Sequence, residues 1–368
     1  MLRSSASLIA LCVALAATSA MAADYGTGGD GADMGLRGGL GADPGSWSGL
    51  EDDTDGLHFE LGVRYWYSLG ATSACTTGGS VVSSDTTHIG ELHLRIEDYP
   101  TNTYAKAIAG YAIATTGAYS GPSGSGSIAD GEVSYIGGDF GWNPLAGPNG
   151  SGAGFLVGYQ YWNEGLDTGR NNYTTALTSA DVTYDQATGQ TFLPGASAPN
   201  MVTANLLRLG VQGKAVMGPI DITAEAAAVP YAKVSGQVGV DDPVFDTSVY
   251  NGPAQAPYTG GYNGNIYQMR GSATTLDGWG YGGMGEVWLG IHPKDNMTFR
   301  VGGRAWYIQG VADARYSLVT VTNPSDSDIA NPPAFDTGPT VNKTNVLETN
   351  NPFSMMRLGL MGELTYRF

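Results

Sequence analysis

The sequence predicts an all-β protein: a closed antiparallel β-barrel of about ten strands that spans a membrane. The main observation is a two-residue alternation of apolar and polar side chains, because successive side chains of a strand point to opposite faces. Residues 353–368 show this clearly, since one face is apolar and ends in Phe368 while the other carries Arg357, Glu363 and Arg367. A membrane barrel turns the apolar face to lipid and the polar face to the lumen.

The composition favours the same fold class. The chain has 368 residues, including 56 Gly, 21 Tyr and 7 Trp, and only 14% of its residues are charged. A helical enzyme or a disordered chain does not have this composition, and disordered chains lack aromatic residues. No run of 18 apolar residues follows the amino terminus, so the sequence predicts no helical membrane span.

The first 56 residues differ from the rest of the chain. Arg3, the apolar stretch at 8–17 and Ala20-Met21-Ala22 have the pattern of a secretory signal peptide over residues 1–22. Residues 23–56 are Gly-rich and acidic without periodicity, so we expect a flexible periplasmic tail there and the barrel over 57–368. Only Cys75 remains after signal removal, which excludes an intramolecular disulfide.

The first five predicted strands lie between residues 57 and 164. The first has the clearest alternation, with Tyr65 on the apolar face and Arg64 on the polar face. The second places Glu91 inward and ends at a turn containing Pro100, which restricts the turn dihedrals. The third is Ala-rich and weaker, the fourth ends at Pro144, and the fifth alternates aromatic with polar residues. Their ranges are 57–69, 87–97, 103–116, 131–142 and 152–164.

The last five predicted strands lie between residues 201 and 368. The sixth alternates apolar residues with Arg208 and ends at a turn containing Pro219. The seventh is Ala-rich with Glu225 inward. The eighth and ninth turn Trp288 and Trp306 inward, and the tenth is the carboxyl-terminal segment. Their ranges are 201–216, 220–235, 277–292, 297–311 and 353–368.

The connections between these strands alternate in length. The short ones are 98–102, 143–151, 217–219 and 293–296, and the long ones are 70–86, 117–130, 165–200, 236–276 and 312–352. Outer-membrane barrels have short periplasmic turns and long extracellular loops. Eight or twelve strands stay open, because the third and seventh segments are weak and 236–276 has room for a hairpin.

The signal peptide, the alternating loops and the aromatic-ended last strand resemble Gram-negative outer-membrane β-barrel proteins, either porin-like or small surface barrels. The resemblance covers residues 57–368 and implies the outer membrane of a Gram-negative bacterium. It also implies outer-membrane lipid and lipopolysaccharide as partners, and a barrel assembly machinery that reads residues 353–368. Acidic loops argue against nucleic acid and other polyanions. The sequence does not identify an extracellular ligand.

The inward positions are predicted to form a network of paired charges in the lumen. Its members are Glu60, Arg64, Glu91, His93, Arg95, Glu97, Glu164, Arg208, Lys214, Glu225, Glu286, Arg300, Arg304, Arg357, Glu363 and Arg367. With Asp139 and Lys106, the inward positions hold eight acids and nine bases. Such charges must be paired in a low dielectric. Because side chains fill an eight-stranded barrel, these pairs and four inward Trp residues have the size to fill most of a ten-stranded one.

The outward positions are predicted to carry the aromatic residues that face the membrane. These are Phe59, Tyr65, Tyr67, Phe155, Tyr159, Tyr161, Phe299, Tyr307, Tyr366 and Phe368.

The first functional hypothesis is a structural or surface-contact barrel with a largely filled lumen. The first alternative is a narrow, weakly selective diffusion pore. The second is an outer-membrane hydrolase, because the chain resembles the omptin proteases in strand number. That resemblance implies an Asp–His pair facing an acidic pair at the outer mouth, and only Asp85 and His88 lie in that region. Without a second acidic pair, a phosphate-binding loop or a Cys/His cluster, we expect no catalytic residues, cofactor or metal.

Overall fold

The computed structural model describes residues 56–76, 79–121, 124–147, 150–185, 190–239, 250–251, 266–294, 296–322 and 339–368. The predicted signal peptide at 1–22 and the predicted tail at 23–56 lie outside these residues, apart from Gly56. Barrel strand β1 begins at Leu57, and β17 ends at Arg367.

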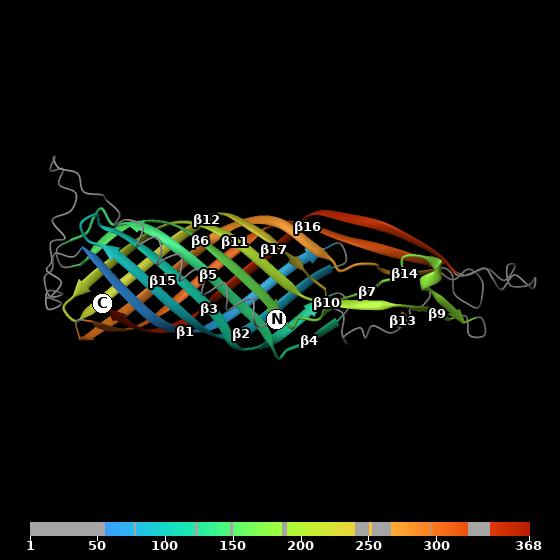
Figure 1. Cartoon of the computed structure of the whole chain (residues 1–368), viewed down its shortest axis with the longest axis horizontal. Helices are drawn as coiled ribbons and strands as arrows, with labels where there is room; N and C mark the ends of the chain where they lie inside the picture. Colours follow the sequence, from blue (N-terminus) through green and yellow to red (C-terminus); the bar gives the residue numbers. More distant parts are fainter. Residues whose placement is uncertain are drawn as a thin grey trace, which may run out of the picture. The chain divides into compact units, whose positions relative to one another are not determined.

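Ten strands form a closed ring, which confirms the predicted antiparallel barrel. Each ring strand pairs with the next ring strand along the chain, and β1 pairs with β17 to close the ring. In Figure 1 the strands run at a common tilt around the barrel. The strands of the ring are β1 Leu57–Thr76, β2 Gly79–Asp98, β3 Thr103–Gly121, β5 Gly131–Trp142, β6 Gly152–Leu166, β11 Met201–Met217, β12 Ile220–Gln237, β15 Thr275–Lys294, β16 Met297–Thr322 and β17 Thr340–Arg367.

The alternation of exposure along the strands distinguishes a membrane barrel from a soluble sandwich. On β1, Tyr65 is 47% exposed while its neighbour Arg64 is 7% exposed. On β17, Leu360 is 72% exposed while Glu363 is 1% exposed. Apolar side chains therefore cover the outside and charged side chains lie inside, as in a barrel that faces lipid.

The register aligns charged residues of opposite sign across the closing seam. Arg64 of β1 lies opposite Glu363 of β17 and opposite Glu91 of β2. A shift of one residue would turn these charges to the lipid, so the seam has one favourable register.

Where the structure describes them, the segments predicted as long loops contain much strand, which corrects the predicted strand bounds. β1 runs to Thr76 and β2 starts at Gly79, so most of 70–86 belongs to a tall hairpin. In the same way, β16 and β17 pair as far as Thr322 and Thr340 within the predicted loop 312–352. These parts are rich in Thr and Val, which favour strands, and a strand in water tolerates polar residues on both faces. Polar composition therefore marked the end of the membrane-spanning part, not the end of the strand.

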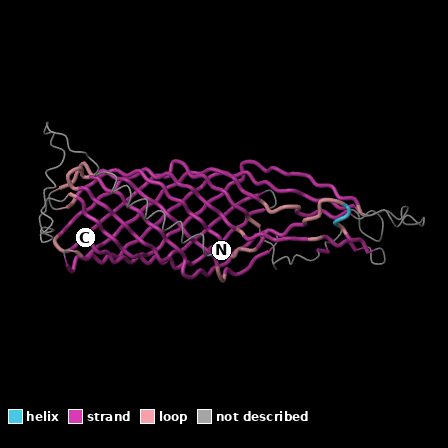
Figure 2. The backbone as a smooth tube through the Cα atoms, viewed as in Figure 1, coloured by secondary structure: helices cyan, strands magenta, loops and turns pink. Residues whose placement is uncertain are grey.

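Shorter strands extend the extracellular side. β14 adds to the outer edge of β16, β4 adds to β3, and two small sheets form from β10 with β7 and from β13 with β9 and β8. In Figure 2, strand segments continue from the ring into this end. Their bounds are β4 Gly124–Ile128, β7 Arg170–Thr174, β8 Thr183–Asp185, β9 Gln190–Leu193, β10 Gly195–Pro199, β13 Tyr250–Asn251 and β14 Ile266–Arg270.

A separate small core holds these extracellular parts together. Leu193 and Val319 are both fully buried, and they cluster with Ala176, Val182 and Val321. The cluster joins the segment after β6 to the β16–β17 hairpin, which are distant in the chain. A 3-10 turn, η2 Ser179–Asp181, lies beside it. Among the described residues, no helix is long and apolar enough to cross a membrane.

Candidate functional site

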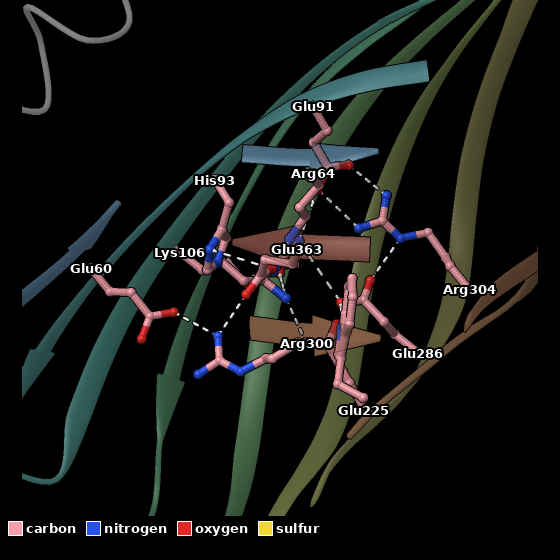
Figure 3. A network of polar contacts seen from close by, with 12 residues as sticks. Glu60, Arg64, Glu91, His93, Lys106, Glu225, Glu286, Arg300, Arg304 and Glu363 are labelled. Carbon is pink, nitrogen blue, oxygen red and sulfur yellow. Dashed lines mark hydrogen bonds and ion pairs between the residues drawn. The ribbon is translucent and has the colours of Figure 1, made fainter. Parts of the chain in front are cut away.

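The interior of the barrel is the candidate functional site, and its centre is a set of linked ion pairs (Figure 3). Arg64 donates from Nε to Glu363, and its Nη1 lies 2.8 Å from Oε1 of Glu91. Arg300 Nη1 lies 2.8 Å from Glu60 and 2.6 Å from Glu363, so it bridges two carboxylates. These residues come from β1, β2, β16 and β17, and the ion pairs therefore join the strands at the closing seam.

Arg304 extends the network across the lumen. Its Nη1 lies 2.6 Å from Glu91 and its Nε lies 2.7 Å from Glu286. The hydroxyl of Tyr135 donates to Glu91, and the indole N–H of Trp288 donates to Glu286. Each of these carboxylates thus receives both a cation and a neutral donor.

A compact group of two cations and two carboxylates lies on the opposite wall. Lys106 Nζ is 3.0 Å from Asp139 and 2.6 Å from Glu225. Arg208 is 3.0 Å from Asp139 and donates a second hydrogen bond to Glu225. The two positive and two negative charges of this group cancel.

A second ion-pair layer lies closer to the extracellular side and is centred on Arg357, which is 1% exposed. Its Nη1 and Nη2 lie 2.8 and 3.1 Å from the two oxygens of Asp85, a bidentate pair. Its Nη2 also lies 3.1 Å from Glu164. Thr87 and Thr72 donate to these carboxylates at 2.5 and 2.8 Å, so the layer contains two acids and one base with additional neutral donors.

An aromatic layer lies between the two ion-pair layers. Tyr135 stacks on Trp162 with ring centroids 5.0 Å apart, and Trp306 meets Trp162 edge-on at 4.8 Å. The ring of Trp66 meets those of Tyr135 and Trp162 edge-on, with ring centroids 6.2 and 6.5 Å apart. All four rings are at most 4% exposed. The guanidinium of Arg304 lies over the ring of Trp66 and that of Arg357 over Trp162, which couples the layers through cation–π contacts.

The periplasmic end of the lumen is less completely paired. Arg95 lies 2.7 Å from Glu97, and Arg367 lies 3.7 Å from the same carboxylate. Lys214 is in the predicted network, but no described carboxylate lies within 4.0 Å of it. His292 and Arg300 flank the buried Asp221 at 3.5 and 3.6 Å.

Sequence reasoning missed two interior acids. Asp85 was assigned to a loop and Asp221 to the start of a strand after a turn, yet both are at most 5% exposed. The two-residue period indicates both, because it places Asp85 on the same face as Glu91 and Asp221 on the same face as Glu225. They raise the interior acids from eight to ten, against nine bases.

The aromatic residues predicted to face the membrane lie on the outer face of the strands. All except Tyr161 are more than a third exposed, and Tyr161 is partly covered. Outward Tyr231, Trp279 and Tyr281 add to them near the extracellular side. Aromatic residues at this level are typical of the interface between hydrocarbon and head groups.

The acid and the imidazole considered for an omptin-like site do not meet. Asp85 points into the lumen, where it binds Arg357. His88 lies on the outer face, where the Tyr65 hydroxyl contacts its Nδ1 and Tyr67 packs against its ring. The spacing of three residues places the pair on opposite faces of a strand, so the Asp85–His88 hypothesis is wrong.

One group inside the barrel has the residue types of a metal site. Ligand atoms of Glu60, His93 and Glu363 all lie within 4.8 Å of one another. However, Arg300 Nη1 donates to both Glu60 and Glu363, so a cationic side chain already lies between the two carboxylates. A second cation there would be repelled by Arg300 and by Arg64. The donor set does not fit a metal ion.

One small cavity lies inside the network. This cavity, beside Lys106, Glu225 and Arg304, has a volume of about 10 Å³, enough for about one water molecule.

In the extracellular turn beside the small core, hydrogen bonds stabilise the charged carboxylate of Asp181. The backbone N–H groups of Leu177 and Thr178 donate to Asp181 at 3.0 and 2.8 Å. These hydrogen bonds, together with that from the Thr178 hydroxyl, lower the pKa of Asp181.

Similarity to known proteins is found in the structure and not in the sequence. No protein-family model matches the chain, and no curated protein matches its sequence. The outer membrane protease OmpT from Escherichia coli has a similar structure, with a TM-score of 0.52 and 10% identity over 85% of this chain and 97% of OmpT. The translocator domain of the autotransporter NalP from Neisseria meningitidis has a TM-score of 0.31 and 12% identity, over 87% and 91% of the two chains. OprG from Pseudomonas aeruginosa has a TM-score of 0.25 and 10% identity, over 85% and 96%.

At 10% identity, the likeness to OmpT concerns the fold. The closed ring and its apolar exterior give the chain the fold of outer-membrane β-barrels, whose lipid-facing band belongs in the outer membrane of a Gram-negative bacterium.

Proposed function

We propose that this protein is a closed outer-membrane barrel with a structural or surface-contact role, and that its lumen does not conduct ions or solutes. The aromatic layer of Trp66, Trp162, Trp306 and Tyr135 carries the proposal. Its rings contact one another across the lumen and are nearly inaccessible to solvent. A diffusing ion has to pass this apolar layer without its hydration shell, which is costly in a low dielectric.

The ion-pair layers on both sides support the same reading. A passing ion would have to displace side chains such as Arg304 or Arg357, each of which lies close to two carboxylates. Leaving a buried charge without its partner costs about 3–5 kcal/mol. The network is thus more suited to fixing the strands around a filled centre than to conducting.

A surface-contact role is supported by the extracellular side. The β16–β17 hairpin is paired beyond the ring and is packed, through Val319 and Val321, against the segment that contains Leu193. This folded extracellular part presents a fixed surface, and binding residues commonly lie on connecting segments that a rigid scaffold positions.

Single-channel recording of the purified protein in a planar bilayer tests the proposal. We expect no steady open steps from the native chain. The double variant Trp66→Ala, Trp162→Ala removes two of the four rings of the aromatic layer and is expected to admit ions. Trp142→Ala, which alters an outward Trp that is 52% exposed, is the matched control and should stay silent.

Steady open steps from the native chain would overturn the proposal and favour the narrow pore. Silence of the double variant, if it is folded, would contradict the role assigned to the aromatic layer.

A further inference from the structure

The membrane-facing wall contains a groove of about 610 Å³ where four neighbouring strands carry mostly small side chains. The strands are β12, β15, β16 and β17, and two adjacent rows of paired residues form the groove. One row is Ala228, Gly283, Tyr307 and Met356, and the other is Ala226, Gly285, Ala305 and Leu358. The groove is broad, because it crosses four strands but covers only a few residues of each.

The floor of the groove is small and its surroundings are large. The two alanines of β12, the two glycines of β15 and Ala305 contribute at most a methyl group each. Tyr281 is next along β15 on one side and Val287 on the other, and both are more than half exposed. The outer surface is therefore hollowed at the floor and raised around it.

Packing within the barrel does not require glycine at the floor. A Cβ at Gly283 would lie 3.6 Å from its nearest neighbour, the carbonyl oxygen of Ala227, which is an ordinary contact. A Cβ at Gly285 would lie 3.8 Å from the carbonyl oxygen of Glu225. By contrast, a Cβ at the adjacent Gly282 would lie 1.9 Å from the carbonyl oxygen of Tyr307. Packing within the wall therefore requires glycine at position 282. At positions 283 and 285 the wall would accept a larger residue, and the glycines there leave open space on the lipid side.

We propose that this groove binds acyl chains of a lipid of the outer leaflet, namely the lipid A part of lipopolysaccharide. The groove lies within the apolar outer face, so hydrocarbon surrounds it. An unfilled hollow there would lose dispersion contacts with its lining. The groove is open toward the lipid, and its lining is apolar. A groove that is broad rather than long suits several chains of one lipid lying side by side.

The polar residues beyond the groove place it in the outer leaflet. Trp279 and Tyr281 lie between the groove and the extracellular extensions, at the level of the aromatic girdle. Beyond them, Lys233 pairs with Asp277 on the outer face, and both side chains are about half exposed. Lys233 pairs with Trp279, which is four residues from Gly283 along β15. That is about 13 Å in an extended strand, which separates a phosphorylated head group from chains in the groove.

A second copy of the barrel fits the groove less well. The exposed rings of Tyr281 and Tyr307 stand at its edge, and the outside of a barrel is convex. A neighbouring wall would meet these rings before it reached the floor, whereas separate acyl chains can enter between them.

Native mass spectrometry of the detergent-solubilised protein, titrated with purified lipid A, tests the proposal. We expect the native chain to retain one lipid A molecule. Gly283→Leu fills the floor and should weaken retention at least about tenfold, the equivalent of losing the burial of roughly two methylene groups. The matched control is Gly362→Leu, on the outer face of β17, where a Cβ meets nothing within 4 Å. It should leave retention unchanged, and unchanged heat-induced mobility shifts would show that both variants are folded.

A Gly283→Leu variant that is folded and retains lipid A as well as the native chain would overturn the proposal. Equal retention of phosphatidylethanolamine with chains of the same length would overturn the assignment to lipid A. A native dimer that Gly283→Leu converts to monomer would show that the groove is an interface between two copies.

Discussion

Removing the Arg357 guanidinium is the most informative change to the lumen. Arg357→Met keeps an unbranched apolar side chain of similar length but leaves Asp85 and Glu164 without their cation. Arg357 makes a bidentate pair with Asp85 and hydrogen bonds of 3.1 and 3.2 Å to Glu164. Both carboxylates are at most 6% exposed, so solvent cannot replace the lost cation.

The magnitude follows from this burial. Breaking a buried ion pair by removing one partner costs about 3–5 kcal/mol, because an uncompensated charge remains. The triple variant Arg357→Met, Asp85→Asn, Glu164→Gln removes all three charges together. Because no uncompensated charge remains, this variant should recover more than half of the loss.

The free energy of unfolding in lipid vesicles, measured by urea titration with tryptophan fluorescence, is the assay. Lys233→Ala is the control, because its ion pair with Asp277 is about half exposed and should contribute at most about 1 kcal/mol. A loss below about 1 kcal/mol for Arg357→Met would refute the claim that this layer is shielded from water. So would a triple variant that is less stable than the single one.

Three further predictions concern other parts of the chain. Gly110→Ala should destabilise the barrel by about 1–3 kcal/mol in the same assay, because its Cβ would lie 2.3 Å from the ring of Tyr135, and Gly362→Ala should have little effect. Leu193→Ala should loosen the extracellular core but spare the ring, so limited proteolysis should cleave that part at lower protease concentration while the mobility of the barrel on gels stays native. Because the folded-state pKa of Asp181 is lowered, its contribution to the turn is present above the unfolded pKa and is lost as pH falls through the folded pKa. Hydrogen exchange at the amides of Leu177 and Thr178 should lose protection over that acidic range in the native chain, and Asp181→Asn should remove this dependence.

The sequence was sufficient to predict the fold because the membrane imposes a strict alternation. Each residue in a spanning strand faces either lipid or the lumen, so Tyr65 and Arg64 could be assigned from their spacing alone. The constraint ends where the membrane ends. Beyond that level, β16 still pairs as strand after Ala312, but its alternation is reduced to the short stretch Val319-Thr320-Val321-Thr322. The two valines face the small extracellular core, and so short an alternation does not distinguish the segment from a loop.

The partners within the lumen were beyond sequence reasoning. The inward face of each residue follows from the period, but which cation meets which carboxylate depends on strand register and barrel closure. Arg357, for example, binds Asp85 from β2 and Glu164 from β6, residues 272 and 193 positions away in the chain. The two-residue period also separates Asp85 from His88, because residues three apart lie on opposite faces of a strand. The Asp85–His88 hypothesis was wrong because it treated Asp85 as part of a loop.

Cysteine accessibility tests the central claim, a lipid-facing exterior around a filled interior, most directly. In a Cys75→Ser background, Val157→Cys places a thiol on the outer face and Gln160→Cys places one in the lumen, at positions that are 46% and 3% exposed. In vesicles, we predict that a lipid-soluble maleimide labels only Val157→Cys and that a charged maleimide labels neither until the protein is unfolded. Rapid labelling of Gln160→Cys by the charged reagent would show a water-filled lumen, and rapid labelling of Val157→Cys by it would show an exterior in water; either result would contradict the account.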